Sequence, residues 1–435
     1  AADTAAVIGL DDVLANGTDA DENIDLAGAG LTSATFNVTT ASSADVIDVE
    51  GASTITINAT GNLTATSLTT SSTTAAITVT GAGNVNLGQV DNGVDSLISS
   101  SSTGITTFTA PADNVAFVAT LGSGADVVTI SDEDFATSDA FNIDAGAGTD
   151  VLITDANASG VDTADLGSRY DNFETLRTAG SVDVSYISGI TAIQLTAADT
   201  TTLSGLNATQ MANIEFRADN ATSTTFTPTD ATGSSDVVSL SLKSTTATTT
   251  VDLIGIAVAN IETVNIASET GSTSASATTT NAFGFLANSA DSVTAINITG
   301  DSDVLFTVAA NTLDVVAVTI DASGMTGVGD LQLTQTSDLV TGSTVTGSPN
   351  GDTITLGTTL GSTYNLGAGN DGASTAFATL VADGTDDTIL NMGAGTDTLT
   401  ITDTGATTLT DTHFTNVSSA EALTTDSAAA ISITT

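Results

Sequence analysis

Glycine and aspartate recur together in two zones of this 435-residue chain. Small residues stand two and four positions before an Asp, and most copies carry an aliphatic residue two positions after it. Glycine lets the backbone turn tightly, so that carbonyl oxygens can converge, and Asp adds a carboxylate. Calcium takes about six to eight oxygen ligands, so these segments predict calcium sites. The copies are LGSGADVVTI (121–130), DAGAGTDVLI (144–153), GSPNGDTITLG (347–357), NLGAGNDGA (365–373), VADGTDDTIL (381–390) and NMGAGTDTLTI (391–401).

The charge balance narrows the classes of partner. The chain has 51 acidic and four basic residues, for a formal net charge of −47. Such a chain repels nucleic acid and anionic membranes, so neither is expected as a direct partner. Cysteine is absent, which excludes disulfides, and no run of about 18 apolar residues predicts a transmembrane helix. The start of the chain lacks the cationic and apolar regions of a secretory signal, so a secreted protein would use a C-terminal signal or have been trimmed.

Composition and periodicity predict an all-β fold. Thr, Val, Ser, Ala and Gly dominate, and 40% hydrophobic content provides a core. Apolar residues alternate at Ile55 and Ile57 and again at Ile77 and Val79, and comparable strands recur about every 20 residues. This spacing favours an elongated, multi-domain β-solenoid or parallel β-roll with calcium-binding turns, although a sandwich remains an alternative for 1–110.

Motif changes divide the chain into four expected domains. A looser repeat over residues 161–345 shares the pattern Asn, hydrophobic residue, Glu, strand, with Glu174, Glu215 and Glu262. These Glu side chains are either metal ligands or, as we favour, hydrogen-bond a turn of each repeat. The expected domains are an N-terminal β domain (1–114, solenoid or sandwich), a first calcium-binding segment (115–160), a β-solenoid repeat domain (161–344), and a second calcium-binding roll with a C-terminal β segment (345–435).

Two resemblances follow from these motifs. The Gly-Asp segments resemble, in degenerate form, the RTX nonapeptide G-G-x-G-x-D-x-U-x of calcium-binding β-rolls. The stretch LGSGADVVTI…YDNFETLRTAG (121–178), followed by SSDVVSLSLKS…VANIETVNIAS (234–268) and the roll-like 345–401, resembles the lattice-forming part of Caulobacter-type bacterial surface-layer (S-layer) proteins. That resemblance implies a secreted structural protein that calcium joins into a two-dimensional layer on the cell surface. In that family a helical N-terminal region binds lipopolysaccharide; nothing here resembles it, so such anchoring would use a region not seen in this chain.

The resemblance also implies a set of Ca²⁺ ligands. Asp126, Asp150, Asp371 and Asp397 match the motif's carboxylate, whereas Asp352 and Asp387 follow less regular turns. The first glycine of the nonapeptide is replaced in the four regular copies. The implied ligand set is Gly122, Gly124, Asp126, Gly146, Gly148, Asp150, Asn350, Asp352, Gly367, Gly369, Asp371, Asp387, Gly393, Gly395 and Asp397.

Two other functions were weighed against a structural layer. Polysaccharide-cleaving β-helix enzymes need a base and a cation near the sugar, but this chain has one His (His413) and few, scattered basic residues. We therefore expect no enzymatic activity. A calcium-dependent RTX-type secreted adhesin, or a filament-forming extracellular protein, remains the alternative. An adhesin would normally show tandem, near-identical domains, and the repeats here are short.

Overall fold

The regular secondary structure of the described residues is almost wholly parallel β-strand. The computed structural model describes residues 4–11, 23–27, 30–130, 140–154, 158, 161–196, 201–220, 222–243, 250–269, 280–380, 387–403, 407–425 and 431–434. They fall into two compact units, Ala1–Ile193 and Gln194–Thr435. The described helices are short: α1 (Ala164–Gly167), α2 (Ala208–Met211) and three 3₁₀ turns, Val184–Tyr186, Phe377–Leu380 and Asp411–Phe414. None of the helices described is long and apolar enough to span a membrane.

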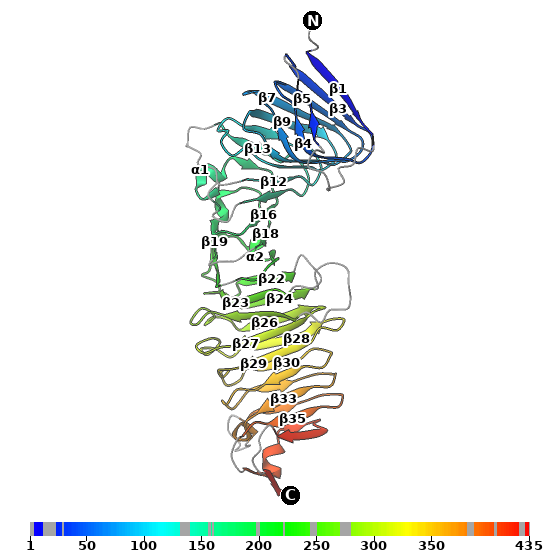
Figure 1. Cartoon of the computed structure of the whole chain (residues 1–435). Coiled ribbons are helices and arrows are strands. Elements are labelled where there is room, and N and C mark those ends of the chain that lie inside the picture. The colour runs from blue at the N-terminus through cyan, green and yellow to red at the C-terminus, as the bar shows by residue number, and fades with distance from the viewer. Residues whose placement is uncertain are drawn as a thin grey trace. The chain divides into compact units, whose positions relative to one another are not determined.

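In the first unit the chain alternates between two sheets. All pairings between their strands are parallel. One sheet contains β1 (Ala5–Leu10), β3 (Ser33–Val38), β5 (Thr54–Ala59), β7 (Ala75–Gly81), β9 (Val94–Ser102), β11 (Val118–Thr120), β13 (Asn142–Asp144) and β15 (Tyr170–Asp171). The other contains β2 (Ile24–Asp25), β4 (Ser42–Asp48), β6 (Leu63–Thr69), β8 (Val85–Val90), β10 (Thr106–Thr109), β12 (Val127–Thr129), β14 (Val151–Ile153) and β16 (Thr175–Thr178). Each turn of chain thus adds one strand to each sheet, which makes a solenoid (Figure 1).

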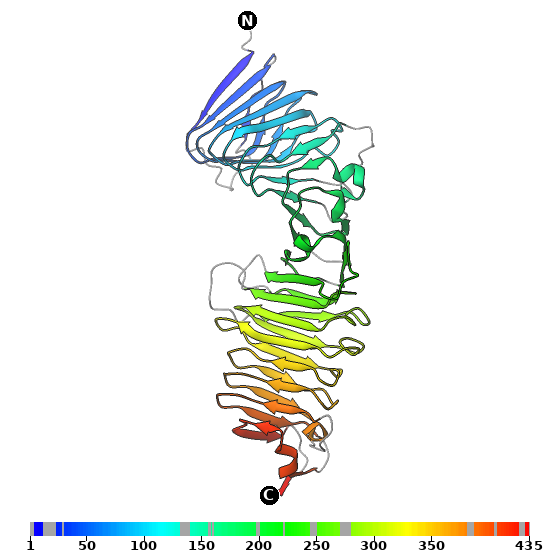
Figure 2. The same cartoon turned by 180° about the vertical axis from the view of Figure 1, so that it is seen from behind.

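The second unit repeats this plan. Its first sheet contains β19 (Thr201–Leu206), β21 (Thr224–Pro228), β23 (Asp252–Ala257), β25 (Thr280–Phe285), β27 (Asp303–Val308), β29 (Leu331–Gln335), β31 (Thr353–Thr355), β33 (Gly372–Thr375), β35 (Thr398–Ile401) and β38 (Ala422–Thr425). Its second contains β20 (Ile214–Phe216), β22 (Val237–Lys243), β24 (Thr263–Glu269), β26 (Ala295–Gly300), β28 (Thr319–Met325), β30 (Thr344–Thr346), β32 (Thr363–Asn365), β34 (Ile389–Asn391) and β37 (Val417–Ser418). Figure 2 shows these strands from behind, stacked as successive rungs. The remaining strands are β17 (Val182–Asp183), β18 (Ala192–Leu195) and the pair β36 (Thr407–Thr410) and β39 (Ile431–Thr434).

The core lies between the two sheets of each unit. The alternating residues Ile55, Ile57, Ile77 and Val79 are fully buried, and Ile55 pairs in register with Ile77. Identical strand faces therefore stack coil upon coil, and each buried aliphatic side chain contributes about 1.5–3 kcal/mol. The predicted all-β solenoid is confirmed. Because sandwiches are built from antiparallel sheets, the parallel pairing excludes the sandwich alternative for the described part of 1–110. The domain boundaries at 115, 160 and 345 stay predictions.

Candidate metal centre: two stacks of carboxylates

In the first unit, three acidic residues lie above one another at the starts of adjacent strands. Asp126, Asp150 and Glu174 directly precede β12, β14 and β16, and the register Val127, Val151, Thr175 brings them together. Asp150 Oδ1 accepts the backbone N–H of Asp126 at 2.6 Å, and Glu174 Oε2 accepts that of Asp150 at 2.8 Å. Asp150 and Glu174 thus each accept the backbone N–H of the acidic residue one coil earlier, whereas Asp126 Oδ1 accepts that of Thr106 at 2.6 Å. We call this set the first carboxylate stack.

The second unit contains a longer stack of the same kind. Asp352, Asp371, Asp397 and Glu421 directly precede β31, β33, β35 and β38. Asp371 Oδ1 accepts the backbone N–H of Asp352 at 2.8 Å. In the next two coils, Asp397 Oδ1 accepts the N–H of Asp371 at 2.8 Å, and Glu421 Oε2 accepts the N–H of Asp397 at 2.9 Å. These four residues form the second carboxylate stack. The predicted Asp ligands of each zone, Asp387 excepted, are therefore brought together.

The Asp residues of the two stacks fall into two groups, according to whether their Oδ2 atom has a hydrogen-bond partner. Asp352 is saturated, because its oxygens also accept the N–H and hydroxyl of Ser348, each at 2.7 Å. Asp126 Oδ2 accepts the N–H of Gly122 at 3.3 Å. By contrast, the Oδ2 atoms of Asp150, Asp371 and Asp397 are buried without a hydrogen-bond partner. An unpaired charged oxygen is costly to bury, so a bound cation beside these three atoms would remove that cost.

Burial shifts the pKa values of Asp150 and Asp371 in the corresponding direction. It raises the pKa of Asp150 to about 6, with the Asp126 and Glu174 carboxylates adding to the shift. It raises the pKa of Asp371 to about 7, where Asp352, Asp397 and Asp330 add repulsion. Without a metal, Asp371 is therefore partly protonated near neutral pH, and Asp150 takes up its proton at slightly acid pH. A bound cation stabilises the charged form instead.

The glycine-rich turns stack along with the carboxylates. Gly146 lies on Gly122 and Gly148 on Gly124; in the second unit, Gly393 lies on Gly367 and Gly395 on Gly369. A Cβ added at the upper glycine of each pair would collide with the carbonyl oxygen of the lower one. Close stacking of backbones therefore requires these glycines whether or not metal is bound. The carbonyls of Gly122 and Gly367 also accept the N–H groups of Ala147 and Ala394, each at 2.9 Å.

Two residues of the implied ligand set take other positions. Asp387 is half-buried and stands two residues before β34, in the sheet that does not carry the stack. Residues 381–386 of its motif lie outside the described residues. Asn350 is in the turn before Asp352, but its side-chain amide donates to the carbonyl of Gly329 at 3.0 Å. Over the part of the chain that the structure describes, no three His, Cys, Asp or Glu side chains gather as a metal cluster. A metal here would rely on backbone and water oxygens beside the carboxylates.

Sequence reasoning identified Glu174 as a hydrogen-bonding residue but missed Glu421 of the second stack. Glu174 and Glu262 accept hydrogen bonds from backbone amides, as we expected, but the amides belong to the neighbouring coil. Glu262 Oε2, for example, accepts the N–H of Asp236 at 2.8 Å. Glu215 instead forms an ion pair with Arg217 at 3.4 Å. Glu421 was not singled out as a site residue. The signal that could have found it is an acidic residue one coil length after an Asp and directly before a strand.

Two replacements of Glu174 should distinguish the effect of its hydrogen bond on stability from the effect of its negative charge. Glu174→Ala leaves the N–H of Asp150 without its acceptor, which should lower the free energy of unfolding by about 1–3 kcal/mol. Glu174→Gln keeps an acceptor oxygen and should retain most of that stability. Chemical denaturation of both variants checks this. Equal loss in the two variants would mean that the Glu174 charge, rather than the hydrogen bond, matters.

The oxygen-only donor set and the unpaired buried oxygens fit a hard cation such as calcium. Asp150 in the first stack, and Asp371 and Asp397 in the second, are the side chains that would hold it. Comparison of the chain with known protein families and with curated proteins found no family and no relative that match it.

Proposed function

We propose that this chain is a structural protein of an extracellular surface layer, and that calcium holds its turns folded and joins its copies. The observation that carries the proposal is the set of buried, unpaired oxygens on Asp150, Asp371 and Asp397, in glycine-rich turns. When bound, calcium would supply positive charge to these oxygens. The acidic residues would position it, and their partner amides would keep the carboxylates oriented.

The charge of the chain supports the assembly part of the proposal. The net charge of −47 makes two copies repel one another. The basic side chains already interact within the chain: Arg169 pairs with Asp165 at 3.2 Å, Arg217 with Glu215 at 3.4 Å and Lys243 with Glu269 at 2.8 Å, and Arg177 also has an interaction there. The protein therefore offers few positive groups to a neighbouring copy. Mobile cations would have to neutralise the acidic faces before contact.

Apolar groups on the outer strand faces support direct contact after neutralisation. Ile98 and Val118 are 46% and 39% exposed, and they lie on the paired strands β9 and β11. Val115, at 45% exposure, stands just before β11. Exposed apolar residues that cluster are typical of protein contact surfaces. Secretion, a cell-surface location and attachment to lipopolysaccharide through another region belong to the same proposal, and they follow only from the resemblance to surface-layer proteins.

Assembly should depend on the unpaired oxygens. In a calcium titration followed by electron microscopy, the wild-type chain should form ordered sheets with calcium, lose them with chelator, and form none with magnesium. Asp397→Asn keeps an acceptor for the N–H of Asp371 but removes the charge, and it should raise the calcium concentration for assembly about tenfold. The matched control is Asp314→Asn, an exposed carboxylate outside the stacks.

The outcome also separates the proposal from its alternative. If Asp397→Asn and Asp314→Asn need the same calcium concentration for assembly, the carboxylate stacks have no role in assembly. Folded chains that bind calcium yet never assemble would favour a secreted adhesin, and a screen for glycan ligands would follow.

A further inference from the structure

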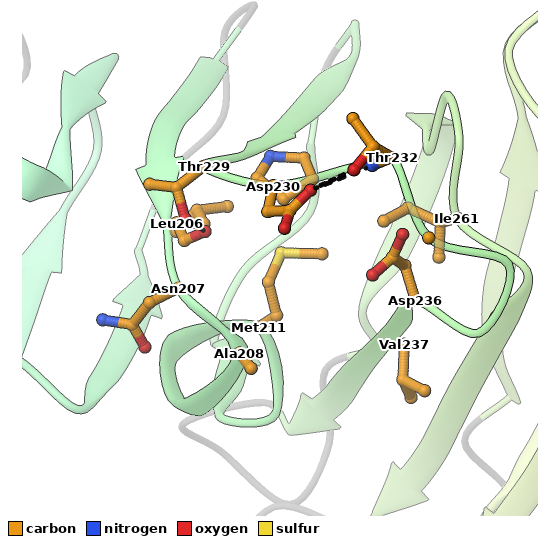
Figure 3. Close-up of a pocket in the computed structure, with 12 residues that line it drawn as sticks. Leu206, Asn207, Ala208, Met211, Thr229, Asp230, Thr232, Asp236, Val237 and Ile261 are labelled. Carbon is orange, nitrogen blue, oxygen red and sulfur yellow. Dashed lines mark hydrogen bonds between the residues drawn. The ribbon is translucent and has the colours of Figure 1, made fainter.

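A pocket of about 340 Å³ lies in the second unit, away from the carboxylate stacks. It opens between α2, the end of β21 and the start of β22 (Figure 3). Three buried apolar side chains form part of its wall, and none of the described residues that line it is Lys, Arg or His. The lining residues that matter here are Leu206, Met211, Pro228, Ile261, Asp230 and Asp236.

Two carboxylates point into this pocket. Figure 3 shows the side chains of Asp230 and Asp236 directed toward the space beside Met211. Asp236 Oδ2 is buried and has no hydrogen-bond partner, because Asp236 bonds to Glu262 through its backbone N–H and carbonyl groups rather than through its carboxylate. The loop leaves room for this carboxylate at Gly233, where an added Cβ would lie 3.2 Å from Asp236 Oδ2.

Asp230 is held in place by its own loop. Its Oδ1 accepts the N–H of Thr232 at 3.1 Å and the Thr232 hydroxyl at 2.7 Å. These hydrogen bonds lower the pKa of Asp230, so that it stays charged at neutral pH. The pocket therefore combines two negative groups on one side with an apolar floor on the other.

We propose that this pocket binds a small organic cation, namely a primary ammonium ion that carries a short apolar chain. The ammonium group would pair with the carboxylates of Asp236 and Asp230, and the chain would lie against Leu206 and Met211. The volume is at the small end of ligand pockets. An inorganic divalent ion would need about six to eight oxygens, and it would leave the apolar part of the wall, at Leu206 and Met211, without a ligand group. A basic side chain of a second copy fits less well too, since Arg169, Arg217 and Lys243 are already ion-paired.

A series of n-alkylammonium chlorides, from methyl to pentyl, tests the proposal by ligand-observed NMR titration of the full chain. Affinity should rise about fourfold for each added methylene until the pocket is full. The neutral 1-pentanol should bind more weakly than pentylammonium. Asp236→Asn should weaken pentylammonium binding about tenfold or more, because it removes the charge of the unpaired oxygen. Asp314→Asn should change it less than about twofold, since exposed charges at a distance are screened.

Asp236→Asn should fold, because the replaced carboxylate makes none of the hydrogen bonds that hold β22; circular dichroism checks this. Two outcomes would overturn the proposal: an affinity that does not change with alkyl length, and an affinity that falls equally in the Asp236 and Asp314 variants. Either would mean that the cations are attracted diffusely to a negatively charged protein. Displacement of pentylammonium by calcium, with calcium binding that is lost in Asp236→Asn, would overturn it in favour of a metal site.

Discussion

Gly148→Ala is expected to lower the free energy of unfolding by about 3 kcal/mol, the upper end of the usual cost of overpacking. The methyl group would collide with the carbonyl oxygen of Gly124 in the adjacent coil and come within 2.9 Å of Asp150 Oδ1. Gly124 cannot move away freely, because its own added Cβ would meet Gly104 in the coil before it. Backbone atoms, rather than a flexible side chain, form the obstacle. Thermal or chemical denaturation in chelator measures the loss.

Gly9→Ala is the matched control in the same unit. Gly9 lies in β1, and nothing is within 4 Å of a Cβ added there. Alanine should therefore leave stability unchanged or raise it slightly, since it restricts the unfolded chain. Equal stability of Gly148→Ala and Gly9→Ala would show that the coils do not stack as closely as described.

The stability of the protein should depend on pH in opposite directions with and without calcium. Burial raises the pKa of Asp150 and Asp330 to about 6 and that of Asp371 to about 7. In chelator, the stability that these groups provide is complete at acid pH and is lost as the pH rises through 6 to 7. Between pH 8 and pH 5 the free energy of unfolding should therefore increase, by about 2 kcal/mol or more. With saturating calcium it should decrease over the same interval, because protons compete with the metal for the carboxylates.

Asp371→Asn tests which group produces this dependence. Asn can still accept the N–H of Asp352 through its side-chain oxygen, and it carries no titrating charge. The variant should flatten the pH profile in chelator and weaken the stabilisation by calcium. The reading of the stacks as cation sites is contradicted if wild-type stability changes with pH in the same direction under both conditions.

The fold could be predicted in outline because its signals are local and repeated. Alternation at Ile55, Ile57, Ile77 and Val79 indicated strands with one buried face, and the spacing of about 20 residues indicated stacked coils. The division at Ile193 could not be read from the sequence. The division reflects the three-dimensional contacts between residues on either side of Ile193, and no Pro-rich linker marks that position in the sequence.

The sequence indicated which Asp residues belong to the candidate site, but it did not indicate the hydrogen bonds that their carboxylates make. Motif spacing placed Asp126 with Asp150, and Asp371 with Asp397. It could not show that one oxygen of each carboxylate accepts a backbone N–H of a neighbouring coil, since that requires the register of the strands. For the same reason Glu421 was missed. The glycines were assigned to calcium, whereas Gly148 and Gly395 are also required by direct contact between backbones.

The most direct test of the central claim is a crystal structure of the chain grown with calcium, with anomalous scattering used to locate the ions. We predict calcium within about 2.3–2.6 Å of the Oδ2 atoms of Asp150, Asp371 and Asp397, the usual Ca–O distance. The opposite result would be calcium only on surface carboxylates, with those three oxygens protonated or hydrogen-bonded to water. That result would contradict the assignment of the carboxylate stacks as metal centres.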